Sequence, residues 1–250
     1  TAMRGTRHNL PAMTTGFVGR ESELAELLRL LASPTSRLVT LLGPGGVGKT
    51  RLAISAAAAA EPAFLNGVWL VQLAGVDTPA ALPWSLADAV GLPLAGAEPP
   101  EAQLLNFLRH RELLLVLDNF EPLIGKAALD LVWRILQQAP AVKLLITSRE
   151  RLNLAGEWLV DLAGLPFPAG SGRGDAQAYP AVQLFVRRSH RVRPDFVVDA
   201  GAGEAVARIC QLTEGLPLAI ELAAAWMRTL PPAQIAEELA RGVALLASTA

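Results

Sequence analysis

The sequence is poor in residues that crosslink proteins or bind soft metals. One cysteine, Cys210, occurs among 250 residues, so no disulfide can form within the chain and a reducing compartment is expected. The histidines His8, His110 and His190 are scattered without the spacing of a zinc site. None of them is paired with a candidate nucleophile, so neither a zinc centre nor a Ser-His-Asp site is indicated.

Long apolar runs and an excess of charge of one sign are also missing. No run is long enough to span a bilayer, and residues 1–10 lack the apolar core of a signal peptide, so we expect no membrane segment and a cytoplasmic location. The net charge is -1, and the basic cluster at 187–193 is typical of a solvated helix face. Direct binding of nucleic acid by this chain is therefore not expected.

The spacing of apolar residues predicts an α/β domain followed by helices. Strands are expected at 37–42, 67–73, 113–117, 143–147 and 157–162, and helical patterns alternate with them. Beyond a Pro/Gly-rich stretch, helical patterns alone recur, at 182–193, 204–213, 218–229 and 232–240. We expect an extended lead-in at 1–16, a domain with a parallel sheet at 17–166, a linker at 167–175 and a small all-α domain at 176–250. Four tryptophans are expected to pack in the core: Trp69, Trp133, Trp158 and Trp226.

A glycine-rich loop between a predicted strand and a predicted helix matches the phosphate-binding pattern G-x-x-x-x-G-K-[ST]. It consists of Gly43, Pro44, Gly45, Gly46, Val47, Gly48, Lys49 and Thr50. In this motif backbone N–H groups surround the phosphates, Lys49 reaches the β- and γ-phosphates, and Thr50 offers a hydroxyl to Mg²⁺. Arg51, at the helix start, is a further candidate contact. The motif predicts a P-loop NTPase fold of the ASCE type.

The same loop also matches the dinucleotide fingerprint G-x-G-x-x-G. That fingerprint requires an acidic residue at the end of the following strand to hold the ribose. Here that strand ends at Gln72 and Leu73, and the next acid is Asp77, in a loop. Lys49 and Thr50 are needed by a P-loop and not by a dinucleotide site, so the P-loop is favoured.

Two later strands end in polar residues that suit a nucleotide site. Asp118 follows the apolar run 113–117 and is a candidate Mg²⁺ ligand. Asn119 comes next and cannot act as a general base, whereas Glu121 could orient water or simply begin a surface helix before Pro122. Arg149 follows the fourth strand and could contact the γ-phosphate, although its spacing fits a surface arginine equally well.

Taken in order, five segments resemble the STAND class of signalling ATPases, of the NACHT and NB-ARC type. They resemble most the ATPase modules of large bacterial transcriptional regulators. The segments are 17–21 (FVGRE), 43–50, 113–121, 146–149 (ITSR) and 215–219 (GLPLA). The resemblance implies that Val18 and Arg20 hold the adenine, that Arg149 senses the γ-phosphate, and that Pro217 belongs to a helical subdomain that closes over the base.

The resemblance also implies a function and partners. We expect a molecular switch that binds ATP or ADP and has weak Mg²⁺-dependent ATPase activity, in a protein with further domains (a winged helix and sensor repeats) that can oligomerise on activation. Asn119 stands where NB-ARC relatives commonly have an acid, which predicts slow hydrolysis. Two alternatives stay open: a small-molecule kinase, for which the sequence offers neither an acceptor pocket nor a base, and a scaffold that holds ADP without hydrolysis.

Overall fold

The computed structural model describes residues 7–13, 17–168 and 176–248, which group into two compact units. The first unit comprises 7–13, 21–43 and 49–162, and the second comprises 17–20, 44–48, 163–168 and 176–248. Parts of the expected lead-in (1–6, 14–16) and most of the expected linker (169–175) lie outside the described residues. The expected domain limits therefore stay predictions.

A five-stranded sheet organises the first unit. Every strand pair is parallel, and the strand order is β2-β3-β4-β1-β5. Thus β4 lies between the strand that precedes the glycine loop and the strand that ends in Asp118. The predicted P-loop sheet of the ASCE type is confirmed. The strands are β1 (Leu38–Leu42), β2 (Val68–Gln72), β3 (Leu114–Asp118), β4 (Lys143–Ser148) and β5 (Glu157–Asp161).

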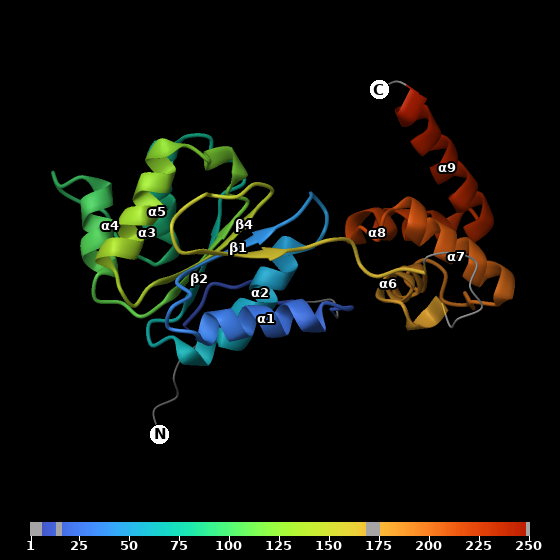
Figure 1. The fold of residues 1–250 in the computed structure, drawn as a ribbon, viewed down its shortest axis with the longest axis horizontal. Helices are drawn as coiled ribbons and strands as arrows, with labels where there is room; N and C mark the ends of the chain where they lie inside the picture. Colours follow the sequence, from blue (N-terminus) through green and yellow to red (C-terminus); the bar gives the residue numbers. More distant parts are fainter. Residues whose placement is uncertain (1–6, 14–16, 169–175, 249–250) are drawn as a thin grey trace. The chain divides into compact units, whose positions relative to one another are not determined.

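Helices cover both faces of this sheet, as Figure 1 shows. One face carries α1 (Glu21–Ala32) and α2 (Lys49–Ala60), and the other carries α3 (Leu82–Ala89), α4 (Pro100–Leu108) and α5 (Lys126–Gln138). Alternate strand residues point to opposite faces. Leu115 and Leu117 therefore pack with Leu104 and Val132 under α3–α5, while Val116 is buried on the other side. Because these strands are buried on both faces, their sequences are apolar at nearly every position.

Two basic side chains tie helix ends to the sheet. Arg37, just before β1, donates to the carbonyls of Leu136 at 2.7 Å and Ala139 at 2.7 Å, at the C-terminus of α5. Lys143, the first residue of β4, donates to the carbonyl of Leu31 at 2.7 Å at the end of α1. The last carbonyls of a helix lack intrahelical partners and carry partial negative charge, so these cations stabilise them.

Residues 7–9 extend the sheet beyond β2. His8 forms a parallel bridge with Val68, and the Asn9 side chain exchanges two hydrogen bonds with the backbone of Leu70, at 2.8 and 2.6 Å. Gly67 has φ +85, and a Cβ there would lie 2.0 Å from the carbonyl oxygen of Arg7. Glycine is therefore required where this segment approaches β2. The sequence offered no pattern for this pairing.

The second unit is helical in its described residues. Its helices are α6 (Pro180–Ser189), α7 (Ala200–Leu212), α8 (Pro217–Ala225) and α9 (Pro232–Ser248), orange to red in Figure 1. They enclose a core that includes Phe185, Ile209, Ile220 and Met227. Cys210 is fully buried there, and burial raises the pKa of its thiol to about 12. The thiol is therefore protonated and unreactive at neutral pH.

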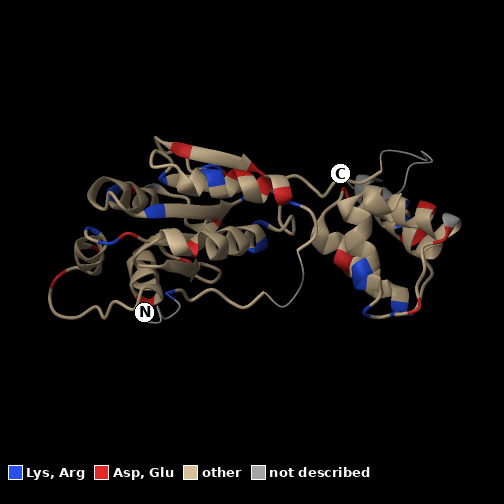
Figure 2. Cartoon of the chain, turned by 90° about the horizontal axis from the view of Figure 1, so that it is seen from below, with Lys and Arg blue, Asp and Glu red and all other residues tan. Residues whose placement is uncertain are grey.

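The remaining short helical turns are 3-10 segments. They are η1 (Glu61–Ala63), η2 (Pro79–Ala81), η3 (Glu121–Leu123), η4 (Ala176–Ala178) and η5 (Trp226–Arg228). Acidic and basic residues are intermixed in both units (Figure 2). Among the described helices, none combines the length and the apolar character of a membrane span.

The prediction that the tryptophans pack in the core was wrong for three of them. Trp133, Trp158 and Trp226 are 39%, 44% and 43% exposed, whereas Trp69 is partly buried against the core. Trp158 lies on β5, an edge strand, which has a neighbouring strand on one side only. Tryptophan is large and amphipathic, so it is often highly but incompletely buried.

We predict that Arg37→Ala lowers the free energy of unfolding of the first unit by about 2 kcal/mol, because several charge-assisted hydrogen bonds to buried carbonyls are lost. Urea denaturation followed by circular dichroism measures this. Arg29→Ala, which removes an exposed arginine from α1, is the control and should change stability by less than about 0.5 kcal/mol. Equal effects of the two substitutions would contradict a capping role for Arg37.

Candidate functional site

The glycine loop connects the end of β1 to the start of α2 at Lys49. Gly43, Gly46 and Gly48 have φ angles of 152°, 77° and 99°, which side chains rarely tolerate. A Cβ at Gly48 would meet nothing within 4 Å, so its requirement for glycine is conformational rather than steric. Such a backbone turns successive N–H groups toward one side. Helix α2 begins directly after the loop, so its N-terminus is available to bind the same anion.

Lys49 lies among charged groups of the first unit. Its Nζ donates to the carbonyl of Gly43 at 2.7 Å. Burial lowers the pKa of Lys49, the carboxylate of Glu121 raises it, the guanidinium of Arg149 lowers it, and the carboxylate of Asp118 raises it. The fold thus brings together the four side chains that the sequence nominated for catalysis, although they come from the start of α2, the end of β3, the start of η3 and the turn after β4. Their catalytic roles stay predictions.

Thr50 and Asp118 form the candidate metal site. The Thr50 hydroxyl donates to Oδ1 of Asp118 at 2.7 Å. Because the hydroxyl proton points to the carboxylate, the oxygen lone pairs of Thr50 are left for a cation. Among the described residues, no cluster of three His, Cys, Asp or Glu side chains could hold a metal by itself. The donors fit Mg²⁺, which binds one or two protein oxygens together with phosphates and water.

Glu121 and Arg149 are joined by an ion pair. The Nε of Arg149 lies 3.1 Å from Oε1 of Glu121. The Arg149 side chain is 63% exposed, whereas that of Glu121 is 17% exposed. The second carboxylate oxygen, Oε2, is buried and has no hydrogen-bond partner among the described residues. A buried carboxylate oxygen without a partner is costly, so its burial is unusual for a residue that begins a surface helix. The role of Glu121 in hydrolysis stays a prediction.

The residues expected at the adenine lie in the second unit. Val18 packs against the helical core, and Arg20 is 8% exposed with φ +75. Arg20 Nη2 donates to the carbonyl of Val47 at 3.4 Å and to that of Ala163. Pro217 is the first residue of α8, and the next residue, Leu218, donates its backbone N–H to the carbonyl of Gly46 at 3.2 Å. Pro suits this first helical position because it has no N–H to leave unpaired. Their contact with a base stays a prediction.

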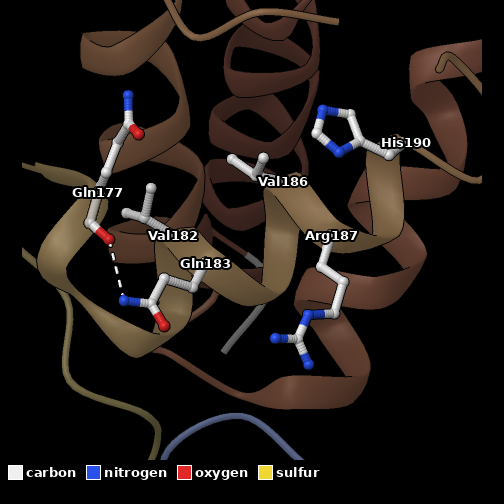
Figure 3. A pocket seen from close by; sticks show the side chains of 6 residues that line it. All are labelled: Gln177, Val182, Gln183, Val186, Arg187 and His190. Atoms are coloured by element: carbon white, nitrogen blue, oxygen red, sulfur yellow. Dashed lines mark hydrogen bonds between the residues drawn. The ribbon is translucent and has the colours of Figure 1, made fainter. Parts of the chain in front are cut away.

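Arg51 and the two described cavities add little to this site. Arg51 is half-buried in the first turn of α2. A cavity of about 350 Å³ lies along α6, where Val182, Val186, Arg187 and His190 are among the residues that line it (Figure 3). Another, of about 390 Å³, lies beside β2 and α3. Neither cavity includes a residue that the sequence nominated.

The comparisons with known proteins agree with this geometry. A family model described as an AAA ATPase domain matches residues 16–155. The chain belongs to the AAA ATPase domain family. The match includes the glycine loop, Asp118, Glu121 and Arg149, so the family relationship covers the phosphate site.

Relatives of this AAA ATPase domain are longer proteins. An uncharacterised protein of Mycobacterium tuberculosis is 38% identical over 231 residues, which are 92% of this chain and 55% of that protein. Another M. tuberculosis protein, with the provisional name HTH-type transcriptional regulator, is 40% identical over 206 residues, 82% of this chain and 22% of that protein. The chain thus spans about half or less of the curated relatives it matches.

A solved structure gives the same fold. The STAND protein with a tetratricopeptide repeat sensor from Pyrococcus horikoshii matches 95% of this chain and 34% of its own, with a TM-score of 0.54 and 17% identity. At this identity the likeness shows the fold alone. The fold of this STAND protein agrees with the fold expected from the resemblance, and the relative named as an HTH-type transcriptional regulator agrees with the expected likeness to modules of bacterial regulators.

Sequence reasoning missed one supporting residue in each unit, Thr147 in β4 of the first unit and Leu218 in α8 of the second. Thr147 contacts Asp118 across the sheet, and Leu218 contacts the glycine loop. Both lie within segments that were noted, but nothing in the local pattern distinguishes them from ordinary strand and helix residues. Only the strand register and the packing of the helices reveal them.

We predict that Lys49→Ala removes a charge-assisted phosphate contact worth about 1.5–3 kcal/mol. Affinity for ATP and ADP should fall roughly ten- to hundredfold, while circular dichroism and melting temperature stay near those of the parent protein. Isothermal titration calorimetry measures the affinity. Arg109→Ala removes an exposed positive charge after α4 and should leave affinity unchanged. A folded Lys49→Ala protein with parental affinity would refute the phosphate assignment.

Proposed function

We propose that this AAA ATPase domain is an ATP/ADP-dependent molecular switch that hydrolyses ATP slowly with Mg²⁺. The observation that carries the proposal is the ion pair between Arg149 and Glu121, beside the lysine of the glycine loop. A cation there can distinguish ATP from ADP, because ATP alone presents a γ-phosphate. A ligand shifts an equilibrium only by its differential affinity for the two states.

Competition for Arg149 is the basis of the proposed switch. With ADP, the guanidinium keeps its contact with Oε1 of Glu121. With ATP, the γ-phosphate offers a more highly charged partner for the same exposed guanidinium, and arginine binds phosphate oxygens in bidentate fashion. The ion pair would then open. The contact with Glu121 uses Nε, and the Arg149 side chain is 63% exposed, so its terminal N–H groups can reach a phosphate.

Slow hydrolysis follows from the residues after β3. Asn119 cannot accept a proton, so the residue next to Asp118 is no general base. Glu121 is the remaining carboxylate, and its buried Oε2 supports a role in orienting water. Its other oxygen, Oε1, is bound by Arg149, so the carboxylate is not available to orient water while the ion pair is closed. We infer that hydrolysis waits for the pair to open.

The wider assignment extends the family resemblance. Val18, Arg20 and Pro217 are proposed to hold the adenine, and Thr50 with Asp118 to hold Mg²⁺. The provisional name of the M. tuberculosis relative and its greater length support a place in a multidomain transcription regulator of the cytoplasm. In that setting, recognition of the signal and of DNA would belong to other domains, and assembly would follow activation.

The two alternatives predict different solution behaviour. A small-molecule kinase would consume ATP faster when its acceptor is present, so turnover is to be measured with and without candidate acceptors. A scaffold would bind ADP and release no phosphate from ATP. Neither alternative requires an arginine that is paired with a carboxylate beside Lys49.

We predict turnover well below the median of about 10 s⁻¹ for enzymes, and Glu121→Gln should abolish the remainder because the amide cannot orient water as the carboxylate does. Phosphate release under saturating ATP measures both. Glu150→Gln alters an exposed carboxylate close by in sequence to Arg149 and should have no effect. Fast hydrolysis that is indifferent to Glu121→Gln would overturn this assignment.

We predict that small-angle scattering gives a more compact particle with ADP than with ATP, and that Arg149→Ala abolishes the difference without weakening ADP binding. Alanine has no guanidinium group, so it can bind neither Glu121 nor the γ-phosphate. Arg151→Ala, which removes an exposed arginine two residues away, should keep the difference. Identical profiles for saturated parental protein would mean that the chain does not switch by itself.

A further inference from the structure

Thr147 occupies a central place beside the phosphate site. It is 1% exposed and lies near the end of β4. On one side the strand register pairs it with Leu41 of β1, two residues before the glycine loop. On the other side its neighbour Ile146 pairs with Leu117, the residue before Asp118. Thr147 thus stands between the strand that leads to the loop and the strand that delivers Asp118.

The Thr147 hydroxyl uses both its donor and its acceptor capacity at this edge. It donates its single proton to Oδ1 of Asp118 at 2.7 Å, and it accepts the backbone N–H of Asn119 at 2.9 Å. The carbonyl of Thr147 accepts the N–H of Phe120 at 3.0 Å. One threonine therefore binds three successive residues, from Asp118 at the end of β3 to Phe120.

These contacts hold an unfavourable backbone turn. Asn119 has φ +65, in the left-handed region that residues other than glycine seldom adopt, although asparagine tolerates it better than most. Such a conformation persists when the surroundings determine it, and the hydrogen bond to Thr147 does so here. The turn buries Phe120 completely and places Glu121 at the start of η3, where it meets Arg149.

We propose that Thr147 is a positioning residue for the nucleotide site. It fixes the Asp118 carboxylate so that Oδ1 receives the Thr50 hydroxyl, and it fixes the turn that presents Glu121. Oδ1 accepts from both threonines, at 2.7 Å each, which locks the carboxylate rotamer. The proposal rests on the proposed role of Asp118 and Thr50 at Mg²⁺, and it adds the residue that makes this arrangement rigid.

The test compares Thr147→Val with Thr147→Ser. Valine keeps the shape and the preference for strands but has no hydroxyl, whereas serine retains it. Without metal or nucleotide, NMR-detected hydrogen exchange should show less protection of the Asn119 amide in Thr147→Val and parental protection in Thr147→Ser. Thr40→Val is a matched control, because Thr40 is buried in β1 and its hydroxyl has no partner among the described residues.

Calorimetry of ATP at increasing Mg²⁺ gives the second readout. The Mg²⁺ concentration for half-maximal enhancement of ATP affinity should rise about tenfold in Thr147→Val, as expected on loss of an outer-shell hydrogen bond. Mg²⁺-free ADP affinity should not change, and Thr147→Ser should restore the parental Mg²⁺ dependence. Equal weakening of ADP and Mg²⁺-ATP binding by valine would indicate a merely structural residue and overturn the proposal.

Asp118→Asn separates this inference from the proposed function. If Asp118→Asn shifts the Mg²⁺ dependence and a folded Thr147→Val does not, the positioning role is wrong while the metal assignment stands. If neither shifts it, the metal role of Asp118 is wrong and the inference fails with it. If Thr147→Val does not fold, the test uses Thr147→Ser. The proposal predicts that the serine hydroxyl is enough to keep the parental Mg²⁺ dependence, so an altered Mg²⁺ dependence in Thr147→Ser would contradict it.

Discussion

The parallel pairing of β4 with β1 and β3 is the constraint on which the phosphate site depends. The register aligns Leu42 with Ser148 and Leu117 with Ile146, so the three strands end at one edge. The chain leaving β1 forms the glycine loop, and the chains leaving β3 and β4 supply the charged groups. A slip of one residue would turn every side chain of the strand to the opposite face, where it would no longer fit its close-packed neighbours. Burial of the core therefore fixes the geometry of the site.

Much of this architecture is visible in local sequence patterns, because strands buried on both faces must be apolar and a phosphate loop must be rich in glycine. All five strands and the helical character of the second unit could be predicted on that basis. Strand order and register could not, since they are set by contacts between distant segments. The roles of Thr147 and Arg37 and the pairing of residues 7–9 with β2 depend on such contacts. The exposed Trp158 is a related case, because an apolar pattern does not reveal that β5 lies at the edge of the sheet.

Unfavourable backbone conformations mark the segments that the family resemblance had singled out. Among the described residues other than glycine, φ is positive at Arg20, Asn119, Asn153 and Glu214. Arg20 lies in the segment assigned to the adenine, Asn119 follows Asp118, and Glu214 precedes the turn into Pro217. Strain of this kind survives where neighbouring contacts determine the conformation, which is common at functional sites. Asn153 lies apart from these segments. Three of the four positions with positive φ therefore lie in or next to a segment that the resemblance had singled out.

The balance of charges around Lys49 explains how the proposed switch could respond to a nucleotide. The cations Lys49 and Arg149 face the anions Asp118 and Glu121, and burial already lowers the pKa of Lys49. A nucleotide brings negative charge to this neutral set, which favours the charged form of Lys49. The γ-phosphate additionally replaces Glu121 as the partner of Arg149 in the proposed mechanism. The carboxylate thereby released is the one proposed to orient water. In this mechanism, transfer of Arg149 from Glu121 to the γ-phosphate would distinguish ATP from ADP. The same transfer would free Glu121 to orient water, so slow hydrolysis would return the protein to the ADP state.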